Sequence, residues 1–201
     1  MLTFRYAIAR LSFVAAMVVF TFAPHAARAQ ATQVERIAIF DAGIYCADTV
    51  QKVTDPTAPG GYRNVVVNQK LMRRTDQIPA LIGTRFGMRY TIVGSPDGAP
   101  VDLRLVTRLP SPGLHEPSGR VILVNEYNYG SSVGTNGYRE YHIEYDWEAL
   151  TGVWVFELWA NERKFAEQPF NLFKPQPGQS RNAPCAPVVG RLAAPKRPLV
   201  N

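Results

Sequence analysis

The segment from residue 152 to 173 constrains the fold more than any other part of this 201-residue sequence. Trp154, Phe156 and Leu158 occupy every second position within it, so an extended strand would place all three side chains on one side. The polar stretch at 160–163 predicts a tight turn, after which the chain returns as a second strand. We therefore predict an antiparallel hairpin with one apolar face near the end of the folded chain.

Three further segments alternate apolar and polar residues, which is typical of strands with one buried and one solvated face. Their apolar positions are Phe86, Met88, Tyr90 and Ile92, then Val101, Leu103, Leu105 and Leu109, and finally Tyr141, Ile143, Tyr145 and Trp147. Less regular apolar runs lie at 37–45, 63–73 and 121–129. Breaks rich in turn-forming residues lie at 56–61, 94–98, 110–113 and 130–137. About eight short strands separated by turns indicate an all-β sandwich or barrel.

The first 29 residues have the features of a cleaved export signal. Arg5 and Arg10 accompany an apolar run at 11–23, and Ala27-Arg28-Ala29 matches a small-x-small cleavage site. The run has about a dozen residues, fewer than the roughly 20 that span a bilayer, although an uncleaved N-terminal anchor is the alternative. We expect a periplasmic or secreted protein with no membrane span after cleavage.

The charge of the exported part is modest. Three arginines leave with the signal, so 19 of the 22 Lys and Arg remain against 16 Asp and Glu, a net charge of +3. Nucleic-acid binding usually leaves a stronger and more clustered basic footprint, so no nucleic-acid partner is expected.

Two cysteines, Cys46 and Cys185, form an isolated pair. In an oxidising compartment such a pair is more often a disulfide than a metal site or a nucleophile. The bond would close a loop of about 140 residues, for which chain entropy allows at most about 5 kcal/mol of stabilisation. The Pro- and Ala-rich tail at 175–201 is otherwise expected to be mostly disordered. One β-sandwich domain with N-terminal extension strands is then expected at 30–174.

Motifs of glycines and aromatic residues follow one another in a fixed order. They are Asp41-x-Gly43-Ile44-Tyr45, Gly83-x-x-Phe86-Gly87-x-x-Tyr90-x-x-x-Gly94-x-Pro96-x-Gly98, and Trp147-Glu148-x-Leu150-x-Gly152-x-Trp154-x-Phe156. This order resembles a family of exported bacterial proteins, domain of unknown function 3859, over about Val34 to Phe173. The resemblance implies an immunoglobulin-like sandwich and supplies no activity, ligand or catalytic residue. Thr151 stands where the family pattern has proline, and both cysteines look particular to this chain, so the disulfide gains no support from the resemblance.

Candidate catalytic residues are few. The stretch Gly130-Ser131-Ser132-Val133-Gly134 matches the Gly-x-Ser-x-Gly pattern of a nucleophile elbow, which requires a helix directly after it. Here a further strand follows, so a flexible hairpin loop is the better interpretation. We predict no catalytic residue and no cofactor.

The best candidate metal ligands are Glu140, His142 and Glu144, with Asp146 beyond them. Alternate positions of an extended strand would place them on one face, about 7 Å apart at each step. Imidazole and carboxylates could bind zinc if another strand completed the shell. The alternative, a solvated polar face, is the interpretation that we adopt.

Aromatic and small polar residues beside the expected 130–137 loop are candidate binding residues: Tyr129, Ser131, Ser132 and Tyr138. Packing in the core is the alternative for the tyrosines. Two basic groups, Arg89, Arg104 and Arg108, and Lys70, Arg73 and Arg74, could meet an anionic partner or form dispersed surface ion pairs.

The sequence thus favours an exported, non-enzymatic β-sandwich that binds a protein or envelope component, through loops at the sandwich end or an open strand edge. A carbohydrate- or small-ligand-binding module is the main alternative. A metal-dependent enzyme built on Glu140, His142 and Glu144 is the weaker one. The partner and the oligomeric state are not set by these patterns.

Overall fold

The computed structural model describes residues 31–176 and Cys185. The expected signal at 1–29 and most of the expected tail at 175–201 lie outside this part, so those two predictions stay predictions. The strands are β1 (Gln33–Thr54), β2 (Tyr62–Arg74), β3 (Gln77–Pro79), β4 (Arg85–Ser95), β5 (Pro100–Arg108), β6 (Leu114–His115), β7 (Val121–Ile122), β8 (Val124–Ser132), β9 (Asn136–His142), β10 (Gly152–Ala160) and β11 (Arg163–Phe173). Two short 3-10 helices, η1 (Pro59–Gly61) and η2 (Asp146–Glu148), interrupt them. None of the helices in the described part is long and apolar enough to cross a membrane.

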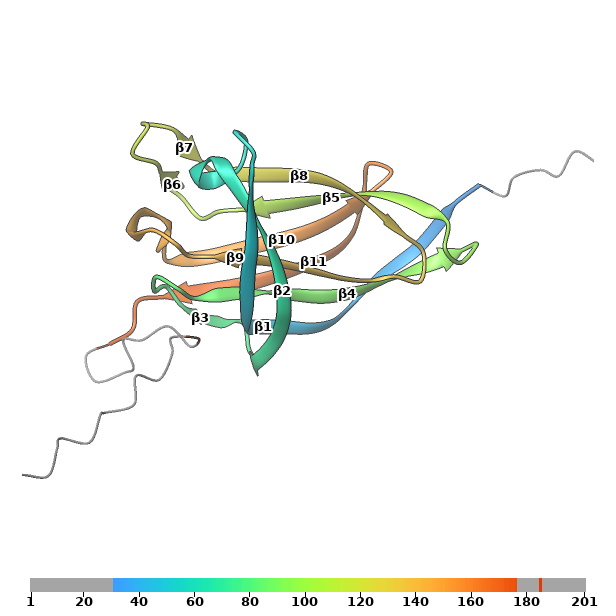
Figure 1. Ribbon diagram of the computed structural model, residues 1–201, viewed down its shortest axis with the longest axis horizontal. Coiled ribbons are helices and arrows are strands. Elements are labelled where there is room, and N and C mark those ends of the chain that lie inside the picture. The colour runs from blue at the N-terminus through green and yellow to red at the C-terminus, as the bar shows by residue number, and fades with distance from the viewer. Residues whose placement is uncertain (1–30, 177–184, 186–201) are drawn as a thin grey trace, which may run out of the picture. The chain divides into compact units, whose positions relative to one another are not determined.

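Two sheets form a sandwich (Figure 1). One has the strand order β2-β1-β4-β9 and the other the order β3-β11-β10-β5-β8, while β6 and β7 pair separately. All pairs are antiparallel except β3 with β11. The chain crosses between the two sheets from β2 to β3, from β3 to β4, from β4 to β5, from β8 to β9 and from β9 to β10.

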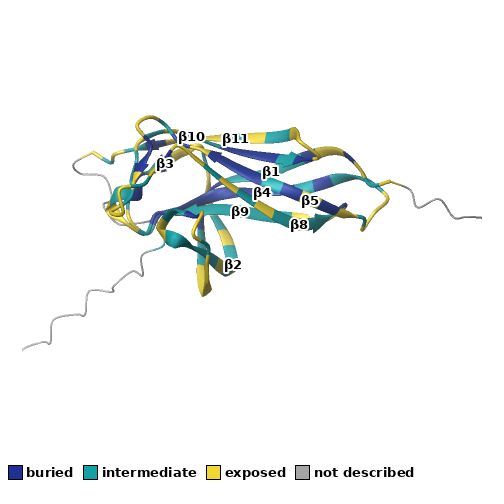
Figure 2. Cartoon of the chain, turned by 90° about the horizontal axis from the view of Figure 1, so that it is seen from above, coloured by how far each residue is buried: buried dark blue, intermediate teal, exposed yellow. Residues whose placement is uncertain are grey.

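The interior between the sheets is built by the alternation that the sequence predicts. Phe86 of β4 is fully buried and meets Trp154, Phe156 and Phe170 of the opposite sheet at ring-centroid distances of 5.6, 5.6 and 5.2 Å. The remaining alternating apolar residues of β4 and β10 are also buried, as the dark bands along these strands show in Figure 2. The prediction that these side chains share a buried face is therefore confirmed.

The turn between β10 and β11 is also as predicted. Ala160 pairs with Arg163, and the two residues between them, Asn161 and Glu162, have φ angles of 47° and 57°. Two consecutive residues with positive φ make the type I′ turn, whose twist suits a two-residue hairpin.

The prediction of a strand through residues 140–147 is wrong in its second half. β9 ends at His142, and η2 follows. The cause is Glu148, whose buried carboxylate accepts hydrogen bonds from the backbone N–H groups of Glu144 (2.6 Å) and Tyr145 (2.9 Å) and from the hydroxyl of Tyr141 (2.8 Å). Such side-chain bonds to the backbone replace a sheet ladder with a turn. Tyr145 consequently points outward and is exposed.

The flexible loop predicted at 130–137 is also shorter than expected. β8 continues to Ser132 and β9 begins at Asn136, so only three residues connect them. Val133 among these is buried, and its N–H donates to the carbonyl of Ala99 at 2.9 Å. Pairing with the neighbouring strands β4 and β5 therefore orders most of the Gly- and Ser-rich stretch.

An extension of β1 and β2 is the feature that the sequence prediction missed. β1 pairs with β4 only as far as Tyr45, and beyond this point it pairs with β2 alone, from Cys46↔Lys70 to Thr54↔Tyr62. We call residues 46–70 the arm. Three register shifts interrupt the β1–β2 pairing near the base of the arm, and because bulges bend and twist a ribbon they re-aim it away from the sheet. Figure 2 shows β2 standing out from the side of the sandwich on which β8 and β9 lie.

Two features fix the base of the arm. Gly43 has a φ of 153°, and a Cβ atom there would lie 2.0 Å from the carbonyl oxygen of Arg73, so only glycine fits between β1 and β2. Cys46, the first residue of the arm, forms the expected disulfide with Cys185, with their Cα atoms 5.5 Å apart. The base is thus held by close backbone packing and by a covalent bond.

Candidate functional site

The arm lies across one open side of the sandwich. β9 and β8 are edge strands of the two sheets, and the arm, which crosses in front of the sandwich in Figure 1, contacts β8 and the stretch just after β9. The hydroxyl of Tyr62 donates to Glu144 just beyond β9 at 2.9 Å, and the guanidinium of Arg63 lies 4.2 Å from the ring centroid of Tyr127 in β8. The arm therefore links the two sheets on the side where no strand joins them.

The tip of the arm is fastened to the β6–β7 region. Arg120 donates from Nη2 to the carbonyl of Ala58 at 2.7 Å and to Glu116 at 2.7 Å, and Glu116 in turn accepts from the N–H of Gly60 at 3.0 Å. The hydrogen bond from Arg120 is the main cause that lowers the pKa of Glu116 to about 2. The charged pair thus clamps η1 in place.

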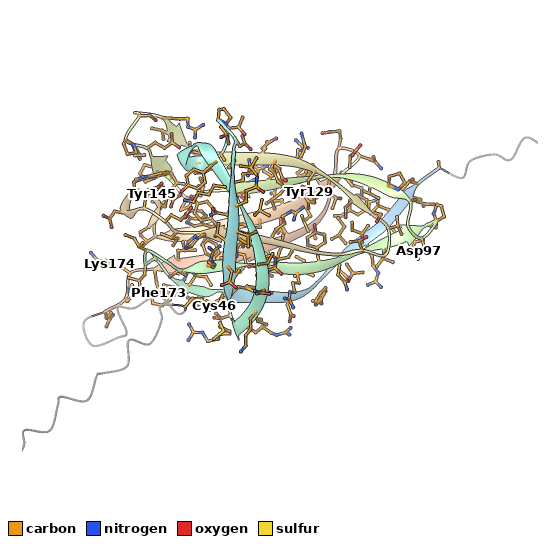
Figure 3. The ribbon with its side chains drawn as sticks, viewed as in Figure 1. Cys46, Asp97, Tyr129, Tyr145, Phe173 and Lys174 are labelled. Atoms are coloured by element: carbon orange, nitrogen blue, oxygen red, sulfur yellow. A yellow bond between two sulfur atoms is a disulfide. The ribbon has the colours of Figure 1, made fainter. Side chains whose placement is uncertain are left out.

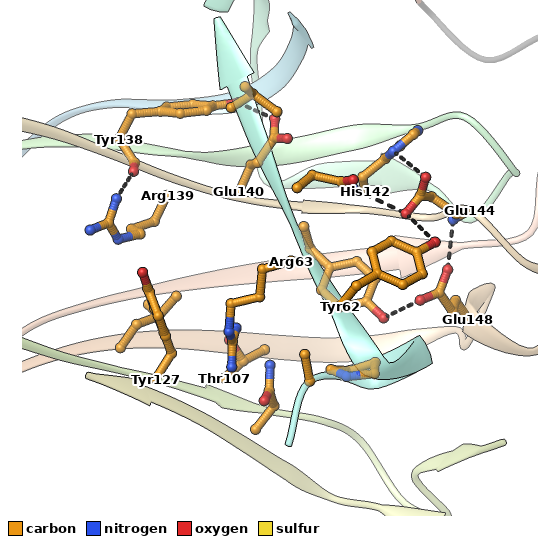
Figure 4. Close-up of a pocket in the computed structure, with 17 residues that line it drawn as sticks. Tyr62, Arg63, Thr107, Tyr127, Tyr138, Arg139, Glu140, His142, Glu144 and Glu148 are labelled. Atoms are coloured by element: carbon orange, nitrogen blue, oxygen red, sulfur yellow. Dashed lines mark hydrogen bonds and ion pairs between the residues drawn. The ribbon is translucent and has the colours of Figure 1, made fainter. Parts of the chain in front are cut away.

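A cavity of about 200 Å³ lies beneath the arm (Figure 4). Its walls are the arm between Ala58 and Val66, the stretch from Tyr138 to Glu148, and four residues of β5 and β8: Leu105, Thr107, Asn125 and Tyr127. These segments are far apart in the sequence, and the arm brings them together. We call this cavity the arm pocket.

Three carboxylates line the arm pocket, and each already has partners. Glu140 pairs with Arg85 and accepts from the hydroxyl of Tyr138 at 2.5 Å. Glu144 accepts from Asn64 at 3.0 Å, from Tyr62 and from Lys52; these hydrogen bonds overcome the effect of burial and lower the pKa of Glu144. Burial raises the pKa of Glu148 despite its hydrogen bonds. The carboxylates therefore serve mainly to hold the arm and η2.

The candidate metal ligands do not assemble as the alternation pattern suggested. His142 Nδ1 lies 3.5 Å from Glu144 Oε1, but the carboxylate of Glu140 is paired with Arg85. Burial, reinforced by the Arg85 guanidinium, lowers the pKa of His142 to about 4, so the imidazole is neutral near pH 7. Within residues 31–176 and Cys185, no three His, Cys, Asp or Glu side chains are grouped so that they could hold a metal ion.

The candidate binding tyrosines are held by contacts within the fold. The hydroxyl of Tyr129 is 2.8 Å from that of Tyr90, and the guanidinium of Arg139 lies 3.5 Å from the Tyr129 ring centroid. Figure 3 places Tyr129 along the sandwich, apart from the turn at Asp97. Tyr138 packs edge-on against Tyr45 and lines the arm pocket.

The two serines lie elsewhere. Ser131 and Ser132 close the β5–β8 pairing, opposite Val101 and Pro100. The hydroxyl of Ser132 is 2.7 Å from that of Thr135, in the short connection to β9. The structure describes all four candidate binding residues, and of these four only Tyr138 lines the arm pocket.

The basic residues divide into two groups. Arg104 and Arg108 form ion pairs with Glu126, Glu162 and Glu157, and Arg89 donates to the carbonyl of Gln69. Lys70 and Arg73 of β2 are exposed, and neither forms an ion pair with any described residue. Of these six candidate basic residues, the two without an ion pair or a carbonyl partner in the described part of the chain, Lys70 and Arg73, therefore both lie on β2.

Exposed apolar side chains also concentrate on β1 and β2. Of the twelve large exposed hydrophobic residues in the described chain, six lie on these two strands: Phe40, Val50, Val53, Val65, Val67 and Met72. The sequence signal for this surface was the irregular run at 63–73, whose valines do not alternate with polar residues. Such a run is typical neither of a half-buried strand nor of a solvated one.

The strand order defines the class of protein. β1, β4 and β9 take the places of strands A, B and E, and β11, β10, β5 and β8 those of G, F, C and C′, in an immunoglobulin-like sandwich. The chain belongs to the family described as Domain of unknown function (DUF3859), whose pattern matches residues 33–172. Both the fold and the family expected from the motifs are thus confirmed. This fold and the disulfide fit an extracytoplasmic protein.

The solved structures that are similar to the chain include two from Pseudomonas species. An immunoglobulin-like protein from Pseudomonas aeruginosa aligns with a TM-score of 0.49 and 22% identity, over 68% of this chain and 96% of its own. The alkylpurine DNA glycosylase AlkC from Pseudomonas fluorescens, bound to DNA containing an abasic site analog, aligns with a TM-score of 0.32 and 16% identity, over 48% of this chain and 27% of its own. At these scores neither likeness bears on function. No curated protein matches the chain.

Proposed function

We propose that this protein is an exported, non-enzymatic binding module that takes an extended acidic segment of a partner protein along the free edge of β2. The observation that carries the proposal is β2 itself. It is a 13-residue strand with a neighbour on one side only, and it has exposed apolar and unpaired basic side chains. An edge of this kind can pair with an added strand through main-chain hydrogen bonds, while its side chains select the partner.

Charge complementarity favours an acidic partner. β2 carries Arg63, Lys70, Arg73 and Arg74 and no acidic residue. Two of these, Arg63 and Arg74, are neutralised by Asp55 and Asp41, which leaves Lys70 and Arg73 free within the described chain. A second copy of the same strand would bring like charges together, which disfavours self-association along this edge.

Site-specific photo-crosslinking in cells tests the proposal. We expect a photo-reactive residue at Val67 or Met72, which are 39% and 48% exposed, to form an adduct with a partner protein. The same residue at Val153, which is 52% exposed on β10 of the other sheet, is the matched control and should form none. Mass spectrometry of the adduct should identify an acidic peptide.

Charge reversal separates specific binding from adventitious contact. Lys70→Glu combined with Arg73→Glu should reduce the adduct yield about tenfold, since each exposed ion pair contributes up to about 1 kcal/mol. Arg36→Glu combined with Arg163→Glu changes the net charge equally at exposed positions outside β2 and should leave the yield unchanged. An adduct that persists in the first variant, or that joins a peptide without acidic residues, would contradict the proposal.

A further inference from the structure

The arm pocket has an unusual share of buried polar atoms without partners. In residues 31–176 and Cys185, six buried side-chain nitrogen or oxygen atoms make no hydrogen bond, and four of them belong to residues that line this pocket. They are Asn64 Oδ1 on the arm, Asn125 Oδ1 on β8, and Arg139 Nε and His142 Nδ1 on β9. Buried polar groups are nearly always hydrogen-bonded in native proteins, so these four atoms, on residues around one cavity, are hydrogen-bonding capacity that the described protein groups leave unused.

The four atoms set the chemistry of the ligand. The two amide oxygens accept hydrogen bonds, and Arg139 Nε–H donates one. A neutral imidazole nitrogen at His142 can do either, according to its tautomer. A carboxylate, or a phosphate without a proton, only accepts and would face both amide oxygens without a bond, whereas an ammonium group only donates. A phosphate that retains a proton also donates, so its charge, and not its hydrogen bonding, decides whether it fits. Hydroxyl groups donate and accept, so they match the whole set.

The charges around the arm pocket favour an uncharged ligand. Three carboxylates, Glu140, Glu144 and Glu148, line it against two guanidinium groups, Arg63 and Arg139. The carboxylates are hydrogen-bonded by protein groups, and Arg63 is paired with Asp55. Arg139 has no ion-pair partner among the described residues, but it is a single guanidinium in a lining that holds three carboxylates, which disfavours an anion. A cation would meet carboxylates that protein groups already hydrogen-bond, and it would lose its hydration.

Size and aromatic geometry narrow the class further. Drug-sized ligands occupy pockets of about 300–1,000 Å³, whereas this cavity measures about 200 Å³. The ring of Tyr127 is stacked with that of Tyr129 at 5.4 Å, and the guanidinium of Arg63 lies 4.2 Å from its centroid. Tyr127 therefore has little free face to stack on a ligand, and recognition must rest on hydrogen bonds.

We propose that the arm pocket binds a small, neutral, polyhydroxylated molecule about the size of one sugar ring, through Asn64, Asn125, Arg139 and His142. The proposed ligand contacts take only Asn64 from β2, near the start of that strand, whereas the protein partner is proposed to meet Lys70 and Arg73 further along it. The two proposals therefore do not depend on each other. It also differs from the sugar site that the sequence suggested beside residues 130–137, because Tyr129, Ser131 and Ser132 do not line it.

A titration followed by two-dimensional nuclear magnetic resonance tests this proposal on the purified exported chain. The probes are D-glucose, D-galactose, N-acetyl-D-glucosamine and glycerol, each raised to about 10 mM, which saturates a site with a Kd near 1 mM. We expect at least one of them to shift the side-chain signals of Asn64, Asn125 and Arg139 in a saturable manner. Asn125→Ala should weaken that binding about tenfold through the lost hydrogen bond.

Asn128→Ala is the matched control, because Asn128 lies on the same strand, is exposed and does not line the arm pocket. It should leave the Kd unchanged. Asn64→Ala provides a second variant if Asn125→Ala fails to fold. Absence of saturable shifts with all four probes would mean that water alone fills the cavity and would overturn the proposal. Stronger shifts with phosphate or acetate would overturn the assignment of a neutral ligand.

Discussion

Replacing Trp154 with alanine should lower the free energy of unfolding by about 3–5 kcal/mol. The Trp154 side chain is fully buried and lies edge-on to Phe86 at 5.6 Å and to Tyr141 at 4.8 Å. Its Nε1–H also donates to the carbonyl of Leu150 at 3.0 Å, which ties β10 to the end of the η2 turn. The substitution would remove all three contacts and leave a cavity between the sheets. Since small domains are stable by only about 5–15 kcal/mol, this loss is a large fraction of the total stability.

Urea denaturation followed by circular dichroism measures this change, with Val153→Ala as the matched control. Val153 is the neighbouring residue on the same strand, but its side chain points outward and is 52% exposed. Its replacement should cost less than about 0.5 kcal/mol. A loss at Trp154 no larger than that at Val153 would mean that Trp154 is not in the core.

Removing the disulfide should have the second large effect. Cys46 and Cys185 are 139 residues apart in the sequence, and closing a loop of this length restricts the unfolded chain by as much as about 5 kcal/mol. The double substitution Cys46→Ser and Cys185→Ser should therefore lower the free energy of unfolding by several kcal/mol, with an upper limit of about 5 kcal/mol. The bond also lies where the arm leaves β4, so its loss should loosen the arm before the sandwich.

Chemical denaturation of the double variant beside the oxidised protein measures the effect. The reduced wild-type protein is the control and should match the variant, because both lack the same covalent constraint. Intact mass after alkylation without reductant establishes the starting state. Two alkylated thiols in the native protein would show that the bond is not formed, and the predicted difference would vanish.

The sequence predicted the parts of the fold that follow from side-chain alternation. Large apolar residues recur at every second position from Phe86 to Ile92 and from Trp154 to Leu158, and each set is buried as expected. The turn after Ala160 was also predictable, since a two-residue hairpin connection needs only local chemistry. These features depend only on short stretches of sequence, in which apolar residues repeat every two positions or a few residues form a turn.

Features set by long-range pairing could not be predicted in this way. β1 continues from Tyr45 to Thr54 because β2 returns beside it, and no alternation marks that continuation. The turn at η2 depends on one buried carboxylate, Glu148, in a segment that otherwise alternates like a strand. Local patterns do not show that such an acid will bond the backbone rather than face water.

The arm pocket could not be predicted from the sequence either, because it also depends on long-range pairing. Asn125 follows Asn64 by about 60 residues, and Arg139 follows Asn125 by 14. The three residues lie around one pocket only because the arm crosses from one sheet to the other. Of the candidate residues from the sequence, Tyr138, Glu140, His142 and Glu144 line this pocket, yet they were chosen for a strand face and a loop. The sequence analysis therefore named some of the residues that line the arm pocket, but it did not predict that the fold brings them together there.

The central claim is that the arm lies folded across the β8–β9 side of the sandwich. Proton–proton distance measurements by nuclear magnetic resonance test it most directly, because Arg63 lies over the Tyr127 ring and the Tyr62 hydroxyl is 3.0 Å from that of Tyr145. We expect cross-peaks between Arg63 and Tyr127 and between the rings of Tyr62 and Tyr145. Absence of both, together with backbone order parameters below about 0.6 throughout residues 46–70, would show a detached, mobile arm and would contradict the account.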